Sequence, residues 1–244
     1  MKMTNRQPKD WRDLQNLVAK YFNESGYLAF TPYKIETARG QVEIDVFVLA
    51  EQELGRTILC ECKFWETKIL QEKAHAFRMV VSDSGASLGI IISKSGFQSG
   101  TIKAVEKTNI ELKTWDEFLA MVYDKWLTSS LTALKRKRAP LGVYMDPLDV
   151  SIEELSEENK EKYLQLIKRY MPINIAIFEI TKKNFIEKEK ILCGTNEFDN
   201  AEEYIEYLSD QTEKALECFE NIFEEINIPE YKFDFPDSYS LFNL

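Results

Sequence analysis

Two apolar runs decide the fold of this chain: Val42-Glu-Ile-Asp-Val-Phe-Val-Leu49 and Thr57-Ile-Leu-Cys-Glu-Cys-Lys63. Successive side chains of a strand point to opposite faces of a sheet. Glu43 and Asp45 are therefore expected to project together from the first strand, and Glu61 and Lys63 from the second. If the strands pair through the intervening turn, these charges converge on one patch of sheet. Buried carboxylates need a partner, and a hard divalent cation is the natural one.

The order Asp45, fifteen residues, then Glu61-Cys62-Lys63 resembles the PD-(D/E)xK nuclease superfamily, and its surroundings resemble the Mrr-type restriction endonucleases. The resemblance extends from about Trp11 to Leu119. It includes a helix ending in Glu24-Ser-Gly-Tyr27, the Gly40-x-x-Glu-Ile-Asp45 strand, and the segment Gly89-Ile-Ile-Ile-Ser-Lys-Ser-Gly-Phe97. The bare spacing is a weak signal. Its position on two adjacent strands, within the right succession of elements, is a stronger one.

The resemblance implies a catalytic site for phosphodiester hydrolysis. Asp45 and Glu61 would bind a magnesium ion, with manganese as a substitute. The backbone carbonyl of Cys62 is a third ligand in the related enzymes. Lys63 would hold the attacking water or offset charge on the scissile phosphate, which suits a compact ammonium group. An exposed salt-bridge patch is the plainer alternative for these side chains.

One position departs from the family pattern. Mrr-like proteins often carry a Glu on the first helix that joins the metal site, and the matching residue here is Gln15. An amide oxygen can bind a hard cation but adds no charge. Glu43, expected on the same face as Asp45, is a candidate for the missing carboxylate. An ordinary surface role is the alternative for both Gln15 and Glu43.

Periodicity predicts an α/β domain over residues 1–128, a restriction-endonuclease-like mixed sheet flanked by helices. The expected elements are a helix at 10–25, strands near 27–36, 42–50 and 56–64, a helix at 70–82, a strand at 86–93, a helix ending at 108, a strand at 110–113 and a helix at 115–127. A basic linker is expected over 129–150, where Pro140, Gly142 and Pro147 interrupt the periodicity. Its cluster Lys135–Arg138 could neutralise phosphates or simply be solvated.

Residues 151–244 predict a smaller, acidic, mainly helical α+β domain for assembly or regulation. The expected elements are a helix at 152–170, strands near 173–181 and 185–192, and a helix at 200–226. Residues 1–150 hold 21 Lys and Arg against 19 Asp and Glu, whereas 151–244 hold 10 against 22. Such acidity repels DNA. The aromatic stripe from Tyr204 to Phe223 is typical of a core or of a seam that contacts a protein partner or a second copy, and the second interpretation favours assembly.

Composition excludes several classes of protein. No stretch reaches the roughly 18 to 20 apolar residues that span a membrane. The polar start, Met1 to Arg6, lacks the apolar centre of a signal peptide, so a cytoplasmic location is expected. The four cysteines show no C-x-x-C spacing, and Cys60 and Cys62 fall on the buried parity of a strand. A single histidine, His75, argues against sites built from several His ligands.

Together these features predict a magnesium-dependent endodeoxyribonuclease of restriction or antiphage-defence type. DNA is the expected substrate, although the residues fit RNA cleavage alike, and a homo-oligomer or a defence complex is the expected assembly. A repair or junction-resolving nuclease is one alternative. A degenerate nuclease fold that acts as a nucleic-acid-binding scaffold subunit is another, from a different functional class.

Overall fold

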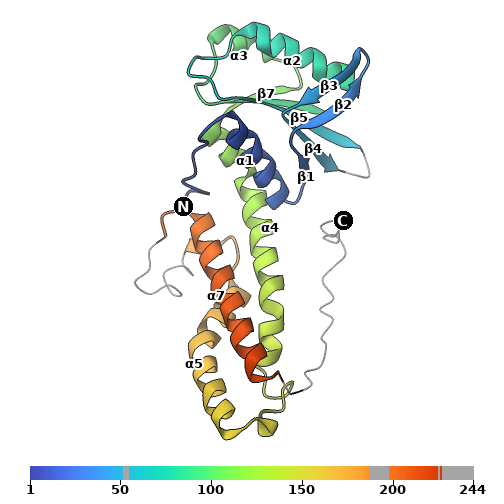
Figure 1. Cartoon of the computed structure of the whole chain (residues 1–244). Coiled ribbons are helices and arrows are strands. Elements are labelled where there is room, and N and C mark those ends of the chain that lie inside the picture. The colour runs from blue at the N-terminus through green and yellow to red at the C-terminus, as the bar shows by residue number, and fades with distance from the viewer. Residues whose placement is uncertain (52–54, 187–197, 225, 227–244) are drawn as a thin grey trace. The chain divides into compact units, whose positions relative to one another are not determined.

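The computed structural model describes residues 1–51, 55–186, 198–224 and 226. The chain divides into two compact units (Figure 1). One, here called the sheet unit, is Arg6–Leu127, and the other, the helical unit, combines Met1–Asn5 with Thr128–Leu244. Within the described residues, no helix is both long and apolar enough to cross a membrane.

A five-stranded mixed sheet and a two-stranded ribbon build the sheet unit. Its elements are α1 (Trp11–Glu24), β1 (Leu28–Phe30), β2 (Tyr33–Thr37), β3 (Gly40–Ile44), β4 (Val46–Glu51), β5 (Arg56–Lys63), α2 (Gln71–Ser84), β6 (Leu88–Ser93), α3 (Ser99–Val105), β7 (Ile110–Thr114) and the first part of α4 (Trp115–Tyr144). The sheet order is β1-β4-β5-β6-β7, and β2 pairs with β3 in the ribbon. Strands β1, β4 and β5 pair antiparallel, whereas β5, β6 and β7 run parallel. The predicted fold class is thereby confirmed.

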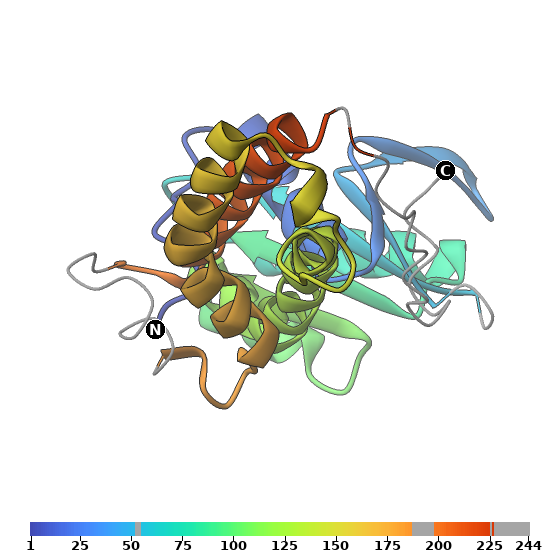
Figure 2. The ribbon, with the colours of Figure 1, turned by 90° about the horizontal axis from the view of Figure 1, so that it is seen from below.

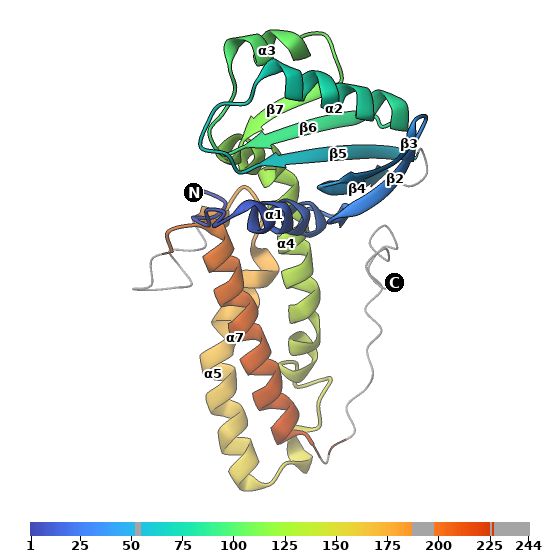
Figure 3. The ribbon, with the colours of Figure 1, turned by 45° about the horizontal axis from the view of Figure 1, so that its top comes forward.

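Helices cover both faces of this sheet, with α1 on one face and α2 and α3 on the other (Figure 3). Helix α1 contacts β1, β4 and β5, and α2 contacts β2 and β6. Leu59 of β5 belongs to the core cluster that includes Phe77 and Val81 of α2. Strand β6 is buried along nearly its whole length, as expected for a parallel strand with helices on both faces.

Local sequence sets the ends of α1. The side chain of Asp10 accepts a hydrogen bond from the Asp13 amide, which satisfies one unpaired N–H of the first turn. The helix ends before Gly26, whose φ of 82° lies in the left-handed region that glycine adopts freely. Leu14, Val18 and Tyr21 recur at helical spacing and are buried, which fixes the rotation of α1 on the sheet.

Among its described residues, the helical unit contains the end of α4, α5 (Glu157–Glu179) and α7 (Ala201–Ile222), with a short 3-10 helix η1 (Ile152–Glu154) before α5. Figure 2 shows α5 and α7 side by side next to α4. Their shared core includes Leu141, Tyr170 and Phe219. The N-terminal residues join this unit, because the Ala201 amide donates to the Lys2 carbonyl oxygen at 2.9 Å and satisfies the first turn of α7.

The break in helical structure expected from residue 128 is absent. Helix α4 continues to Tyr144 with Pro140 inside it. Leu131, Leu134 and Leu141 recur on one side of this helix and are buried, and their packing outweighs the cost of a proline in the helix interior. The basic residues between these leucines hid the periodicity. The nuclease role expected for residues 1–128 and the assembly or regulatory role expected for residues 151–244 stay predictions.

The strand expected at 173–181 is also corrected, because α5 runs through this segment. Alternating isoleucines resemble a strand, but Tyr170, Asn174 and Ile177 are buried at helical spacing. Tertiary packing therefore decides the structure against β propensity. The second expected strand, at 185–192, lies almost entirely outside the described residues.

The aromatic stripe and the basic cluster of the C-terminal half both make contacts within the helical unit. Tyr204, Phe219 and Phe223 of the aromatic stripe are buried in its core, so this stripe is not a free contact surface. In the basic cluster, Lys137 Nζ contacts Glu213 Oε2 of α7 at 3.0 Å, and Arg138 Nε donates to the Asn174 side chain of α5. These two cations lie on a helix and contact neighbouring helices, so this segment is not a solvated linker.

Candidate active site

Asp45 lies at a bend between two strands. Strand β3 ends at Ile44 and β4 begins at Val46, so the first apolar run is not one continuous strand. The β4–β5 ladder begins with Val46 opposite Cys60. Just before this ladder, the Asp45 carboxylate accepts a hydrogen bond from the Cys62 amide and lies close enough to Glu61 for the two charges to interact. The structure therefore brings together the two carboxylates that the sequence predicts on adjacent strands.

Two hydrogen bonds hold the Asp45 carboxylate in place. The backbone N–H of Cys62 donates to Oδ2 at 2.7 Å, and Gln15 Nε2 donates to Oδ1 at 2.7 Å. Helix α1 positions Gln15 for this contact, and its side chain is buried. Gln15 is thus part of the site and not a helix-surface residue, because the strand after the bend faces the middle of α1.

The electrostatics of the site favour a bound cation. Burial raises the pKa of Asp45 above its ordinary value, and the negative charge of Glu61 raises it further. The Cys62 amide, the Lys63 ammonium and the Gln15 amide oppose this effect. Lys63 Nζ forms an ion pair with Glu61 Oε1. Two adjacent carboxylates that share one ammonium form a site that additional positive charge would stabilise.

Glu43 precedes the bend at Asp45, so the two residues do not lie on one continuous strand, and a role for Glu43 in the site stays a prediction. Glu43 lies on β3, which pairs with β2 in the separate ribbon, and it comes opposite Lys34 there. Its side chain is exposed. The bend at Asp45 redirects the chain between β3 and β4, and the alternation rule does not carry across such a bend.

The side chains of the site offer the oxygen atoms that magnesium and manganese prefer, but they offer few of them. Among the residues described, no group of three or more His, Cys, Asp or Glu side chains could hold a metal ion. The available protein oxygens are the carboxylates of Asp45 and Glu61, the amide oxygen of Gln15 and the backbone carbonyl of Cys62. Oxygen donors with two negative charges fit a cation that binds through one or two carboxylates and keeps several waters.

Two cysteines flank the site and are structural. Cys60 and Cys62 are buried free thiols, and burial raises the pKa of both. We expect both to resist maleimide in the native protein at neutral pH, at rates at least about 10³-fold below that of partly exposed Cys218, because labelling requires unfolding of the core strand. Peptide mass spectrometry would check this. Labelling of Cys60 as fast as Cys218 would show that β5 opens readily.

Trp65 is a neighbour of the site that the sequence patterns did not single out. Its ring is 40% exposed, with Lys63 Nζ 5.5 Å and Lys73 Nζ 5.8 Å from its centroid. Its position two residues after Lys63 is a usable signal, since aromatic rings next to lysines are common where nucleic acid binds.

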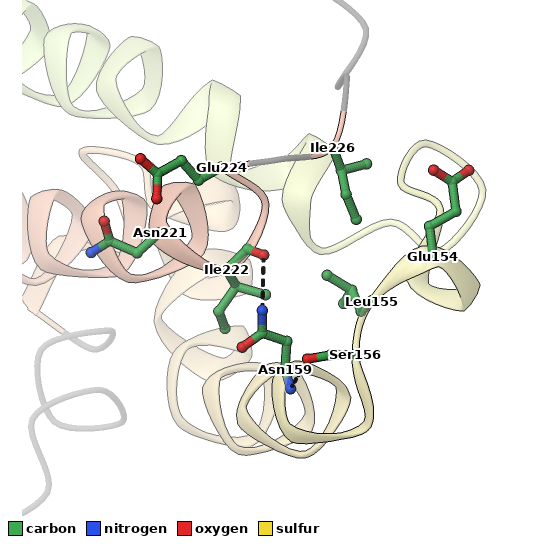
Figure 4. Close-up of a pocket in the computed structure, with 8 residues that line it drawn as sticks. All are labelled: Glu154, Leu155, Ser156, Asn159, Asn221, Ile222, Glu224 and Ile226. Carbon is green, nitrogen blue, oxygen red and sulfur yellow. Dashed lines mark hydrogen bonds between the residues drawn. The ribbon is translucent and has the colours of Figure 1, made fainter.

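A pocket in the helical unit has the wrong charge for nucleic acid. It lies where η1, the start of α5 and the end of α7 meet (Figure 4), and Asn159 Nδ2 donates to the Ile222 carbonyl oxygen there at 3.5 Å. Glu154 and Glu224 line it, and none of its described lining residues is basic. Phosphates would be repelled from it.

The mixed sheet, the two neighbouring carboxylates and the lysine two residues after the second carboxylate form the arrangement that is typical of the PD-(D/E)xK class. Comparison with known families agrees: residues 7–122 match the model of the Mrr_cat family, described as restriction endonuclease. Over these residues, just under half of the chain, the protein is similar to the Mrr-type restriction endonucleases and has their restriction-endonuclease-like fold.

Among curated proteins, none matches the chain. One solved structure, titled "Crystal Structure of Protein of Unknown Function AF1548", is similar at 15% sequence identity and a TM-score of 0.40. The match covers 87% of this chain and 100% of that one. A similarity at this level does not bear on function.

Proposed function

We propose that this protein is a magnesium-dependent endonuclease that hydrolyses phosphodiester bonds in DNA, as part of a restriction or antiphage-defence system. The observation that carries the proposal is the closeness of the Asp45 and Glu61 carboxylates, with Asp45 fixed by the Cys62 amide and Lys63 paired with Glu61. The restriction-endonuclease family match supports the same reaction class.

Asp45 and Glu61 would hold the metal, with the Cys62 carbonyl as a further ligand. A bound divalent cation polarises the phosphoryl group and lowers the pKa of a coordinated water. The Cys62 amide and Gln15 keep the Asp45 carboxylate oriented before substrate arrives. Lys63 would turn from Glu61 toward the scissile phosphate and offset its developing negative charge.

The test is direct cleavage by the full chain. Supercoiled, linear, branched and modified DNA are incubated with Mg²⁺ or Mn²⁺, with Asp45→Ala as the inactive control. Cleavage that needs the metal and is lost in Asp45→Ala supports the proposal. Binding of DNA without cleavage under any of these conditions would instead support the scaffold alternative.

Gln15 offers a second prediction about the metal site. We expect Gln15→Glu to lower the Mg²⁺ concentration needed for half-maximal cleavage, since it adds a third carboxylate beside Asp45. Gln15→Ala should raise that concentration about tenfold, because Asp45 loses a hydrogen bond that orients it. Metal titrations of the cleavage rate measure both shifts.

The thermal stability of Gln15→Glu provides a control that does not depend on activity. Without metal, the added charge should lower Tm relative to the wild type, because it repels Asp45, and Mg²⁺ should restore it. Equal half-saturating Mg²⁺ in all three proteins would remove Gln15 from the metal site.

The helical unit is proposed to serve assembly or control. Residues 151–244 hold 10 basic against 22 acidic residues, so this region is unsuited to binding a polyanion. Sedimentation of the full chain, alone and with DNA, tests whether it acts through a second copy. A strictly monomeric chain in both states would leave a separate protein partner as the assembly route.

A further inference from the structure

A cavity lies next to the proposed active site, within the sheet unit. Its volume is about 460 Å³, and it is bounded by the β2–β3 ribbon, strands β4 and β5, and the C-terminal end of α2. This volume falls in the range of pockets that bind small organic groups. None of the proposed catalytic residues lines this cavity.

Aromatic rings form one wall of the cavity. Tyr33 and Phe47 are stacked, with ring centroids 4.6 Å apart and an interplanar angle of 26°. Phe30 continues the group, 5.4 Å from Tyr33. Tyr33 is 38% exposed and Phe30 40%, so the rings are open to a ligand. Exposed stacked rings of this kind suit a flat aromatic partner.

The cavity and the catalytic carboxylates are neighbours on the same two strands. Phe47 pairs with Leu59 in the β4–β5 ladder, and both residues line the cavity. They lie two positions along their strands from Asp45 and Glu61. Two strand residues span about 7 Å, which is about the reach of a single nucleotide. A nucleotide whose phosphate occupies the site could therefore place its base against Tyr33 and Phe47.

The charge of the cavity selects a base over a phosphate. Glu36 is one of the residues that line it, and so is Gly85, which ends α2. A helix C-terminus carries partial negative charge on its last carbonyl groups. These groups repel phosphate but accept hydrogen bonds from the ring N–H and amino groups of a nucleobase. Lys34 also lines the cavity and is exposed.

We propose that this cavity binds an unpaired nucleobase next to the scissile phosphate, with the base stacked on Tyr33. The inference rests on the proposed nuclease function and names its substrate class: DNA that offers an unpaired base at the cut, as at a bulge, a flap, a junction or a base extruded from the duplex. A fully paired base cannot reach the cavity while it remains in the helical stack.

Binding without metal tests the cavity separately from cleavage. The full chain in EDTA is titrated against fluorescein-labelled DNA, either a perfect duplex, the same duplex with one bulged base, or the bulged duplex with an abasic site at the bulge. We expect the bulged base to bind on the order of tenfold tighter than the other two. Tyr33→Ala and Tyr33→Leu should abolish this preference, and Tyr33→Phe should retain it because the ring remains.

A control variant and a fluorescence measurement test whether the preference comes from stacking on Tyr33. Phe178→Ala removes an exposed ring of the helical unit and should leave the preference intact. A 2-aminopurine in the bulge should lose fluorescence on binding to the wild type and stay bright with Tyr33→Leu. Melting curves confirm that each variant is folded, and if Tyr33→Ala does not fold, Tyr33→Leu decides.

The outcomes separate the two proposals. Equal binding of all three DNAs, or a preference that survives Tyr33→Leu, overturns the cavity proposal even if cleavage depends on Asp45. A preference that depends on the Tyr33 ring supports it even if no metal produces cleavage, in which case only the nuclease proposal fails.

Discussion

Asp45→Ala, Glu61→Ala and Lys63→Ala should each reduce the rate of DNA cleavage by at least about 10³-fold while leaving the fold intact. Two of these residues supply the negative charge of the metal site, and the third supplies positive charge toward the phosphate. Single-turnover cleavage rates measure the loss, and circular dichroism confirms the fold. The expectation follows from the closeness of the Asp45 carboxylate to Glu61 and to the Cys62 amide, and from the ion pair between Glu61 and Lys63.

Glu43→Ala is the matched control for these variants. It removes a carboxylate two residues from Asp45, but the side chain is exposed and comes opposite Lys34 on the ribbon, so cleavage should change less than about threefold. Ca²⁺ should bind the site without supporting turnover, since its looser coordination does not enforce octahedral geometry. Near-normal rates in any two of the three alanine variants would refute the assignment.

Strand alternation predicts correctly only those site residues that lie on regular strands. Cys60 and Cys62 are buried on β5, and Glu61 and Lys63 share the other parity, as expected. Glu43 shows where this reasoning stops. Nothing in a run of alternating apolar residues reveals that the chain bends at Asp45, because each half still reads as a strand.

Gln15 could be placed in the site from the family pattern but not from its own chemistry. An amide on a helix is usually solvated, and only the docking of α1 against β4 and β5 buries it beside Asp45. The cavity at Tyr33 is even harder to predict from the sequence. It depends on the ribbon, β4, β5 and α2 meeting in space, and no local pattern encodes such a meeting.

The C-terminal half was predicted less well because its signals compete. Pro140 and Pro172 each argue against a helix interior, yet both lie inside long helices. A proline removes one hydrogen bond and costs about 3 kcal/mol, whereas each large buried side chain contributes about 1.5 to 3 kcal/mol. Leu141 and Tyr170, buried close to these prolines, belong to the core that outweighs them.

Gly89 is the position where one added carbon should do the most structural damage. It lies on β6, opposite Leu59 on one side and Ile110 on the other. A Cβ at this position would come within 2.6 Å of Ile110 Cδ1, 2.7 Å of Val81 Cγ2 and 2.9 Å of Phe77 Cε1. The absence of a side chain lets α2 pack directly on the sheet, and this packing also forms one end of the cavity beside the active site.

Gly89→Ala should therefore destabilise the protein by about 1 to 3 kcal/mol, and Gly89→Val should cost more and leave little folded protein at 37 °C. Urea unfolding monitored by circular dichroism measures both. Gly100→Ala is the matched control: its new Cβ would meet only the flexible end of Gln71, at 3.0 Å, and alanine favours the helix it joins. Its stability should equal or slightly exceed that of the wild type. If Gly89→Ala unfolded at the wild-type urea midpoint, α2 would be free to move away from the sheet, and the packing of α2 described above would be wrong.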